Sequence, residues 1–468
     1  MNYKYLDYIK DKLKNNFDIV YRKLNHKNTN LCMIFVSNLC DSKFISNYII
    51  YPIIKDENFS YTIESLQENI ISANSVGIVK DKDDAIMHIL SGDVVILSDS
   101  SKEVMYIEAK GFVKRNVSIP STESVIKGPK ESFTEVLMDN ISLIRRKLKN
   151  PNLKVENFTI GNTTNTLVAL CYLEGTAPQK LVDDIKNKIQ NINIDVTLES
   201  NSIEEKLSYN KSFFDTTSTS EKPDVISSKI IEGRVALIID GSPFVITVPH
   251  FFIENIQMAD DYYTKKSFAN LNRFIRWIAL FICLFLPGMY LAITTHHFPL
   301  IPYVFVFRLA KSRAGVPFPT IIEVLLMTFF FQLVREAGLR LPQPIGQSMS
   351  IVGALILGDA AVGAGLASQT TMVIVGITSI STFLVPKFYN AVAMWSIVFS
   401  ITSAFGGLPA FYLTFCVFLS HISSLESCGY PYLYPIGTSN KINAKDILSR
   451  NDLESSNDPI PSDNNNNK

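Results

Sequence analysis

The amino-acid sequence predicts an α+β/α multi-domain membrane protein, in which two soluble α/β subdomains precede a C-terminal helical transmembrane domain. The main observation is the distribution of charge. Residues 1–276 are charged throughout, whereas residues 277–307 contain no Lys, Arg, Asp or Glu, and residues 341–420 contain two, Asp359 and Lys387. A net charge of zero with 47% hydrophobic residues argues against a nucleic-acid partner. We therefore expect membrane lipid around the second half of the chain.

The first soluble subdomain is expected within residues 1–120. Apolar residues at helical or alternating spacing mark its elements, and polar turns bound them. The expected segments are a charged amphipathic helix in residues 1–24, a strand at 31–37, helices at 43–54 and 65–73, and a hairpin of strands at 92–99 and 103–109. The first helix has no continuous apolar core, so it is neither a secretory signal nor a membrane span.

The second soluble subdomain is expected within residues 121–260 and repeats the mixture of helices and strands. Its expected segments are a helix at 132–150, one or two strands in 155–175, a helix at 179–192, an extended polar loop at 212–224 and a hairpin in 233–249 around the turn dipeptide Asp240 and Gly241. Residues 261–276 are expected to link this subdomain to the membrane.

The transmembrane domain is expected to span residues 277–435. About twenty helical residues cross a hydrocarbon core of roughly 30 Å, and residues 277–295 suffice for that. Residues 320–334 are apolar but number about fifteen, which fits a buried or re-entrant partial helix as well as a span. Further candidates are 349–367, 372–385, and one or two helices in 389–419. We expect four or five spans, one partial helix, and a polar disordered tail at 436–468.

Basic residues before the first span indicate the orientation. Lys and Arg are more frequent on the cytoplasmic side of membrane helices, so the N-terminal region is expected in the cytoplasm. The basic residues concerned are Lys265, Lys266, Arg273 and Arg276, and the opposing residues in a later loop are Arg308, Lys311 and Arg313. The later loop weakens the asymmetry.

The sequence gives no sign of an enzyme or of a cofactor. Its six cysteines form no CxxC pair and have no histidine at metal-binding spacing. The segment 128–133 lacks the second glycine and the Lys-Ser/Thr order of a phosphate-binding loop. No catalytic triad or carboxylate pair can be assembled from the order of residues. We expect no catalytic residue, no metal and no cofactor.

Four charged residues lie around the expected partial helix, namely Glu323, Arg335, Glu336 and Arg340. Ionisable groups at membrane depth cost free energy and are usually kept for a reason. Glu336 and Arg340 are spaced to pair on one helical face. Two interpretations stay open: a structural ion pair at the membrane boundary, or a gate or coupling joint that rearranges when a partner moves.

A stripe of small residues crosses the next expected helix. Small side chains permit close helix packing in membranes, either within one subunit or between copies around an axis. Asp359 has no evident local partner, and a ring of such acids would favour cations. The candidate pore or packing residues are Gly346, Ser348, Ser350, Ala354, Gly358, Asp359 and Val362.

Several distinctive sequence blocks follow one another in order over residues 124–435. They include GPKESF at 128–133, NISLIRRKLKNPNL at 140–153, EGRVALIIDGSP at 232–243, DDYY at 260–263 and REAGLRLPQPIGQSMSIVGALILGDAAV at 335–362. In these blocks the chain resembles the A subunit of the spore germinant receptors, the GerA family of endospore-forming bacteria. The chain departs from the family pattern at Thr328 and Gln332, where that pattern tends to carry acidic residues.

The resemblance implies a multi-pass membrane protein of the spore inner membrane that takes part in nutrient-triggered germination. It implies two partners, a transporter-like B subunit and a lipoprotein C subunit, and a homo-oligomer that forms an ion-conducting path. Two alternatives are a secondary transporter of a small molecule, which inverted repeats would support, and a membrane-anchored scaffold for the other subunits. The resemblance does not reveal the nutrient.

Overall fold

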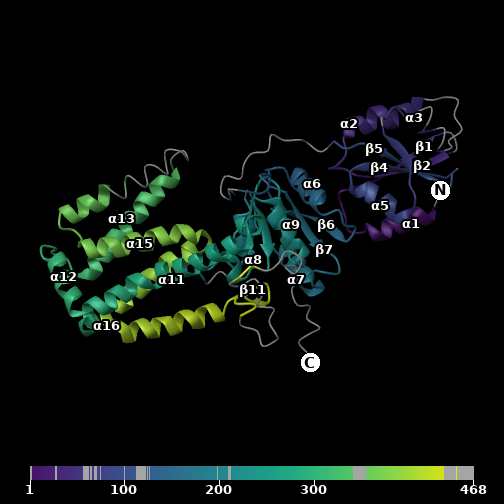
Figure 1. Ribbon diagram of the computed structural model, residues 1–468. Coiled ribbons are helices and arrows are strands. Elements are labelled where there is room, and N and C mark those ends of the chain that lie inside the picture. The colour runs from purple at the N-terminus through teal and green to yellow at the C-terminus, as the bar shows by residue number, and fades with distance from the viewer. Residues whose placement is uncertain are drawn as a thin grey trace.

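The computed structural model describes residues 3–26, 29–55, 63, 66–67, 71–73, 75–99, 101–111, 123, 125, 127–197, 199–208, 212–340, 353, 356–436 and 449–450. Figure 1 shows two α/β units and a helical half that follow one another in a row. The chain passes from the first unit through the second to the helices.

The first subdomain is a five-stranded antiparallel sheet with helices on both faces. Its strand order is β1-β2-β4-β5-β3. The elements are α1 (Tyr3–Lys12), β1 (Ile19–His26), β2 (Thr29–Val36), α2 (Ser42–Phe44), the π-helix η1 (Ile45–Ile50), α3 (Tyr51–Lys55), β3 (Val76–Ile78), α5 (Lys82–Leu90), β4 (Asp93–Ser98) and β5 (Val104–Glu108). Helices α1 and α5 share one apolar core with the sheet, and α2, η1 and α3 share the other.

Two segments of this subdomain differ from the expected helices. The helix expected through residue 24 is wrong beyond Lys12, because residues from Ile19 onward form β1 and pair with β2, with Ile19 opposite Val36. Tertiary pairing outweighs the helical pattern there. Of the helix expected at 65–73, residues 66–67 are helical, residues 71–73 are not, and the other four lie outside the described residues.

The second subdomain has the same strand arrangement as the first. Its order, β6-β7-β9-β10-β8, again places the strands first, second, fourth, fifth and third. The elements are α6 (Leu137–Lys147), β6 (Leu153–Ile160), β7 (Thr166–Leu173), α7 (Gln179–Gln190), α8 (Asn201–Leu207), β8 (Ser218–Ser220), α9 (Pro223–Ile231), β9 (Val235–Ile239) and β10 (Val245–Val248). Helices α6 and α9 cover one face, and α7 and α8 the other. The expected loop at 212–224 thus contains an edge strand.

A buried ion pair joins the two subdomains. Arg145 of α6 donates from Nε to Asp18 Oδ2 at 2.7 Å and from Nη2 to Asp18 Oδ1 at 2.8 Å. The side chain of Asp18 is 0% exposed and that of Arg145 is 1% exposed. Nearby, Asn16 Oδ1 accepts from the backbone N–H of Val155 at 2.9 Å. The two units therefore meet through fixed polar contacts.

The helical half begins before the expected linker of residues 261–276. Its elements are the 3-10 helix η3 (Phe252–Asn255), α10 (Asp260–Tyr263), α11 (Lys266–His296), η4 (Phe298–Leu300), α12 (Tyr303–Arg313), α13 (Thr320–Arg340), α15 (Gln369–Leu384), η5 (Pro386–Phe388), α16 (Tyr389–Ser423), β11 (Glu426–Ser427) and β12 (Tyr430–Pro431). The segment 261–276 is therefore helical over most of its length, and α11 runs from the soluble side into the apolar half without a break.

Helix α16 reverses direction at Gly407. This residue has φ 62° and ψ −148°, which is not helical. Trp395 and Phe418 have ring centroids 5.0 Å apart, and Thr414 Oγ1 donates to Thr402 Oγ1 at 2.9 Å. Residues 23 positions apart in a straight helix would be separated by about 35 Å. The element is thus a hairpin of two antiparallel helices, which decides between the one or two helices expected there.

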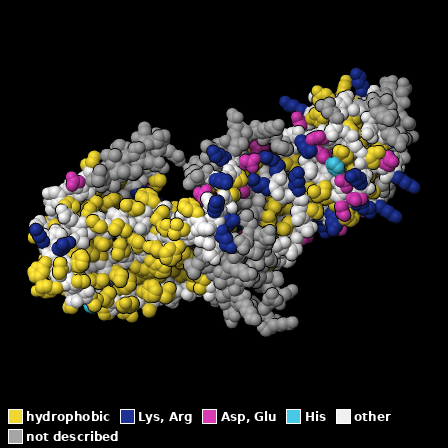
Figure 2. Space-filling model, in the orientation of Figure 1, with side chains coloured by type: hydrophobic (Ala, Val, Ile, Leu, Met, Phe, Trp, Pro, Cys, Tyr) yellow, Lys and Arg dark blue, Asp and Glu magenta, His cyan; other side chains and the backbone are white. Residues whose placement is uncertain are grey.

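Hydrophobic side chains cover the visible face of the helical half, whereas charged side chains dot the two α/β units (Figure 2). Among the described residues, two elements are long and apolar enough to cross a membrane, Lys266–His296 and Pro386–Ser423. Large apolar side chains such as Phe405 and Leu413 are 79% and 69% exposed. A surface with many exposed large apolar side chains is typical of a domain surrounded by lipid. The number of spans, expected as four or five, stays a prediction.

Helix α13 is longer than expected. It has 21 residues, Thr320–Arg340, rather than about fifteen. At 1.5 Å per residue it extends about 30 Å. It is not among the described elements that are long and apolar enough to cross a membrane, so the interpretation as a partial helix stays a prediction. The charged residues Arg335, Glu336 and Arg340 are good helix formers and continue the helix instead of ending it.

Candidate functional site

A cavity of about 870 Å³ lies in the membrane half between α13, α15, the first part of α16 and the helical segment 356–363. Its walls are mostly apolar. Polar side chains also line it, among them Thr328, Gln332, Arg335, Asp359 and Thr382. Four of the sequence-predicted site residues, Arg335, Gly358, Asp359 and Val362, therefore line one cavity.

Glu323 is fixed at the opposite end of α13 from Arg335. Its carboxylate is 0% exposed and lies at the N-terminus of α15. Glu323 Oε2 accepts from the backbone N–H of Ser368 at 2.9 Å and from Thr371 Oγ1 at 3.0 Å, and Arg313 Nε lies 3.5 Å from Glu323 Oε1. Free N–H groups and the helix dipole favour a negative charge at this position. Glu323 thus joins α13 to α15.

Arg335 has a different environment. Its guanidinium lies 3.4 Å from the ring centroid of Tyr389 and 5.4 Å from that of Phe383. Nη1 donates to Thr382 Oγ1 at 3.5 Å. Within the described part of the chain, no carboxylate oxygen lies within 4.0 Å of this guanidinium. Stacking on two aromatic faces holds the cation without neutralising it.

Glu336 and Arg340 form an exposed pair one turn apart. Arg340 Nη2 donates to Glu336 Oε1 at 2.6 Å, and the two side chains are 50% and 77% exposed, Glu336 being the less exposed. An exposed pair of this kind contributes about 0–1 kcal/mol to the free energy of unfolding. The pair does not line the cavity, so it is separate from Arg335.

Three of the seven candidate pore residues, Gly358, Asp359 and Val362, belong to the described part of the chain. Gly346, Ser348, Ser350 and Ala354 lie outside the described residues. A Cβ placed on Gly358 would stand 2.2 Å from Met372 Cε, so this glycine is in close contact with α15. Asp359 is exposed and Val362 is half-buried, and both line the cavity. The segment 356–363 thus packs Gly358 against α15, and the carboxylate of Asp359 lies exposed at the cavity.

A buried polar cluster that sequence reasoning missed lies at the junction between the soluble and membrane halves. Arg234 Nη2 donates to Glu254 Oε1 at 2.6 Å, Lys229 Nζ lies 3.4 Å from Glu254 Oε2, and His250 Nδ1 lies 3.1 Å from the same oxygen. Burial lowers the pKa of Lys229 to about 8 and also lowers the pKa of His250, against the opposite effect of Glu254. Although burial alone would raise it, the pKa of Glu254 is held well below its usual range by Arg234 and Lys229.

This cluster continues into the chain that follows α16. His250 Nε2 lies 2.8 Å from Asn255 Oδ1, and Asn255 Nδ2 donates to Tyr432 OH at 3.0 Å. Phe252 and Phe388 pack with ring centroids 4.8 Å apart. Both the entry to the membrane half and the exit from it are therefore bound to the second subdomain.

Asp261 fixes the start of α11. Arg276 Nη2 donates to Asp261 Oδ1 at 2.5 Å, and Arg273 Nε donates to Asp261 Oδ2 at 3.1 Å. Arg273 and Arg276 are buried and paired with Asp261, and the orientation that the basic residues indicate stays a prediction. The signal available in the sequence was the spacing of three residues between the two arginines on one helical face. In the expected tail, Arg450 Nη1 donates to the carbonyl of Asp261 at 2.8 Å.

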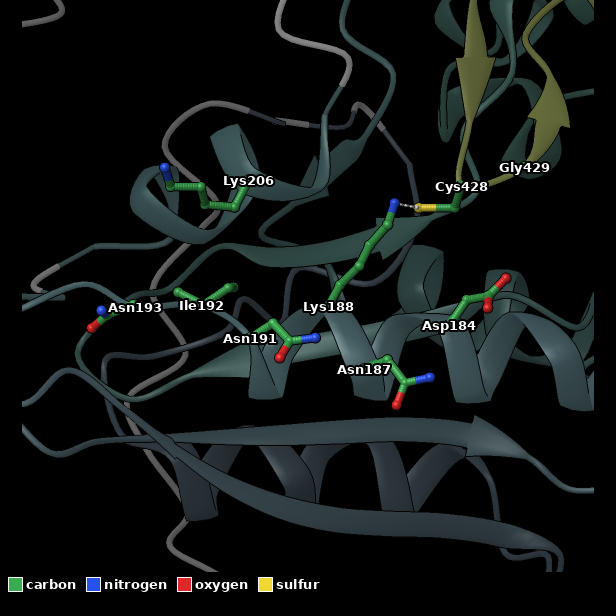
Figure 3. A pocket seen from close by; sticks show the side chains of 9 residues that line it. All are labelled: Asp184, Asn187, Lys188, Asn191, Ile192, Asn193, Lys206, Cys428 and Gly429. Carbon is green, nitrogen blue, oxygen red and sulfur yellow. Dashed lines mark hydrogen bonds between the residues drawn. The ribbon is translucent and has the colours of Figure 1, made fainter.

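A second, polar pocket of about 640 Å³ lies on the soluble half, between α7, α8 and the turn that joins β11 to β12. Figure 3 shows Asp184, Asn187 and Lys188 on α7, with Lys188 pointing toward Cys428. Lys188 Nζ lies 3.9 Å from Cys428 Sγ. Asp184, Asn187 and Lys188 are exposed, and among the described residues no three His, Cys, Asp or Glu side chains are grouped to hold a metal ion. The pocket was not expected from the sequence.

The family described as "Bacillus/Clostridium GerA spore germination protein" matches residues 7–459. The chain belongs to this GerA family. It is 36% identical to spore germination protein KA of Bacillus subtilis (strain 168) over 442 residues, which cover 92% of this chain and 81% of that protein. It is 32% identical to spore germination protein A1 of the same organism over 446 residues, covering 94% and 91%.

Two further GerA relatives were found. The uncharacterized membrane protein YfkQ of Bacillus subtilis (strain 168) is 36% identical over 440 residues, covering 92% of this chain and 85% of that protein. The crystal structure of the N-terminal domain of the A subunit of the Bacillus megaterium spore germinant receptor GerK3 covers 53% of this chain and 94% of its own, at 28% identity and a TM-score of 0.42. GerA membership supports a role in spore germination.

Proposed function

We propose that this chain is a membrane subunit of a nutrient germinant receptor and that copies of it assemble around a nutrient-gated cation path in the spore inner membrane. The observation that carries the proposal is the exposed Asp359. A lone carboxylate on an apolar surface costs free energy unless it faces water or a partner. A ring of subunits would place this carboxylate in a shared aqueous path, where it would attract cations.

The contacts at the junction support a coupling role for the rest of the molecule. Helix α11 continues from the soluble side into the membrane half, and Asp261 fixes its first turns. A displacement of the second subdomain would therefore move α11 as a rigid element. In this proposal Arg335, Glu336 and Arg340 are coupling charges near the soluble end, and Glu323 is the anchor that keeps α13 and α15 together.

We infer the partners from the family. A transporter-like B subunit would bind the nutrient, and a lipoprotein C subunit would complete the receptor. The two α/β subdomains would lie in the cytoplasm, where a moving partner would press on them or on the membrane half.

Cation flux from liposomes tests the proposal. Purified chain is reconstituted, and efflux of a monovalent cation is compared for the unchanged protein, Asp359→Asn and Asp359→Glu. We expect flux from the unchanged protein, a reduced flux for Asp359→Asn because the carboxylate charge is removed, and flux near the original for Asp359→Glu. Equal flux from all three would exclude Asp359 from the path, and uptake of a labelled solute instead of cation flux would favour the transporter alternative.

A further inference from the structure

Arg335 lies at the level where the membrane half meets the soluble half. Its guanidinium covers Tyr389, which follows Phe388, and Phe388 packs on Phe252 of η3, the element of the helical half that directly follows the second subdomain. Arginine and tyrosine side chains are typical of the headgroup region, because each has an apolar body and a polar end. The guanidinium has five N–H donors, and its one described hydrogen bond goes to Thr382. Arg335 is thus placed to bind an anionic group at headgroup depth.

The cavity extends from Arg335 toward the middle of the membrane half. Along α13 its lining runs over ten residues from Arg335 to Leu325, and along α15 it runs from Phe383 to Gln369, past Met372, which contacts the segment that carries Asp359. Ten helical residues correspond to about 15 Å. This length is half of a hydrocarbon core of roughly 30 Å, which is the depth of one leaflet. Exposed apolar side chains at its edge, such as Val373 and Ile380, face the surrounding lipid.

We propose that the cavity binds an anionic phospholipid of the leaflet on the soluble-domain side, with its phosphate on Arg335 and one acyl chain between α13 and α15. Arginine forms charge-assisted, often bidentate hydrogen bonds to phosphate, and basic pockets between membrane helices bind anionic headgroups. A cation at one end and walls that are mostly apolar match the two ends of a phospholipid, and Thr328, Gln332 and Asp359 add polar atoms to those walls. The proposal does not depend on an ion path.

A second copy of the chain is a weaker occupant. Copies in a ring around the membrane normal all sit at the same depth, so the exposed Asp359 of one copy would stay about 15 Å from the depth of Arg335 of the next. The exposed Asp359 therefore cannot neutralise Arg335 across such an interface. A lipid phosphate supplies the missing anion at the correct depth.

Glycines in the membrane half provide matched variants. Gly376 lines the cavity, and a Cβ placed on it would have no atom within 4 Å. Gly376→Leu would therefore add side-chain atoms at the cavity wall, at a position where a Cβ meets no neighbour. A Cβ on Gly363 also has no atom within 4 Å, and Gly363 does not line the cavity, so Gly363→Leu is the control.

The test is lipid retention by the full-length chain in detergent, measured by native mass spectrometry with phosphatidylglycerol and phosphatidylcholine of identical acyl chains. We expect the unchanged protein and Gly363→Leu to prefer phosphatidylglycerol by at least about tenfold. Arg335→Gln should abolish the preference, Arg335→Lys should keep part of it, and Gly376→Leu should reduce retention of both lipids.

Two results would overturn the lipid site. One is an unchanged preference for phosphatidylglycerol in Arg335→Gln. The other is unchanged lipid retention in Gly376→Leu together with an altered oligomer mass, which would assign the cavity to a second copy of the chain. Cation flux is measured separately, so the loss of lipid binding and the loss of an ion path are distinguishable.

Discussion

Replacing Asp18 by Asn removes one charge from the buried ion pair that joins the two soluble subdomains. Asp18 accepts two hydrogen bonds from Arg145, at 2.7 and 2.8 Å, and both side chains are almost fully buried. Removing one partner of a buried pair leaves the other charge uncompensated and costs about 3–5 kcal/mol. For a soluble region of this size the thermal midpoint should fall by about 6–20 °C.

The assay is thermal unfolding of the purified full-length chain in detergent, followed by circular dichroism. The control is Arg146→Ala on the same helix, because Arg146 pairs with Glu131 at the surface. Loss of that pair should cost about 0–1 kcal/mol. The double variant Asp18→Leu with Arg145→Met should be more stable than Asp18→Asn, since it leaves no buried charge. A midpoint for Asp18→Asn equal to that of Arg146→Ala would refute the reasoning.

Three further predictions follow from local contacts. Gly407→Ala should lower the thermal midpoint, because φ is 62° and a Cβ would stand 2.7 Å from His297 Cε1. The control is Gly429→Ala, which also lies at positive φ but has no atom within 4 Å of its Cβ, and it should lower the midpoint less. Burial lowers the pKa of His250 in the folded chain, so the imidazole of the unfolded chain is protonated first as the pH falls. The free energy of unfolding should therefore fall as the pH falls below about 6.5. His250→Asn should flatten this dependence between about pH 7.5 and 5.5. Glu323→Gln should destabilise the membrane half by about 1.5–3 kcal/mol, measured as a lower midpoint, and an unchanged midpoint would contradict its anchoring role.

The soluble elements were predictable where a single pattern dominates. The hairpin of β4 and β5 and the helix α7 follow from apolar spacing and polar turns. The segment that becomes β1 was not predictable, because its residues also fit an amphipathic helix and only the pairing with β2 decides which structure forms. The repeated strand order was not expected either, since it depends on which strands pair and the sequence blocks show no repeat.

Some residues of the candidate site were likewise predictable from the sequence and others were not. Charge at membrane depth drew attention to Arg335 and Asp359, which line one cavity. Nothing in the order of residues indicated that Glu254, Lys229 and His250 would meet, because tertiary folding brings them together at the junction. The arginines before the first span were predicted only as a basic flank, and their pairing with a carboxylate of the preceding short helix was not expected.

The mass of the detergent-purified protein tests the central claim most directly. One chain has a mass of 52.5 kDa, and a single copy cannot enclose a path beside an outward-facing Asp359. Light scattering corrected for bound detergent gives the number of chains per particle. The account predicts a closed multimer of this chain. A particle that contains one copy at all concentrations would contradict it and would leave the chain as an accessory to another pore.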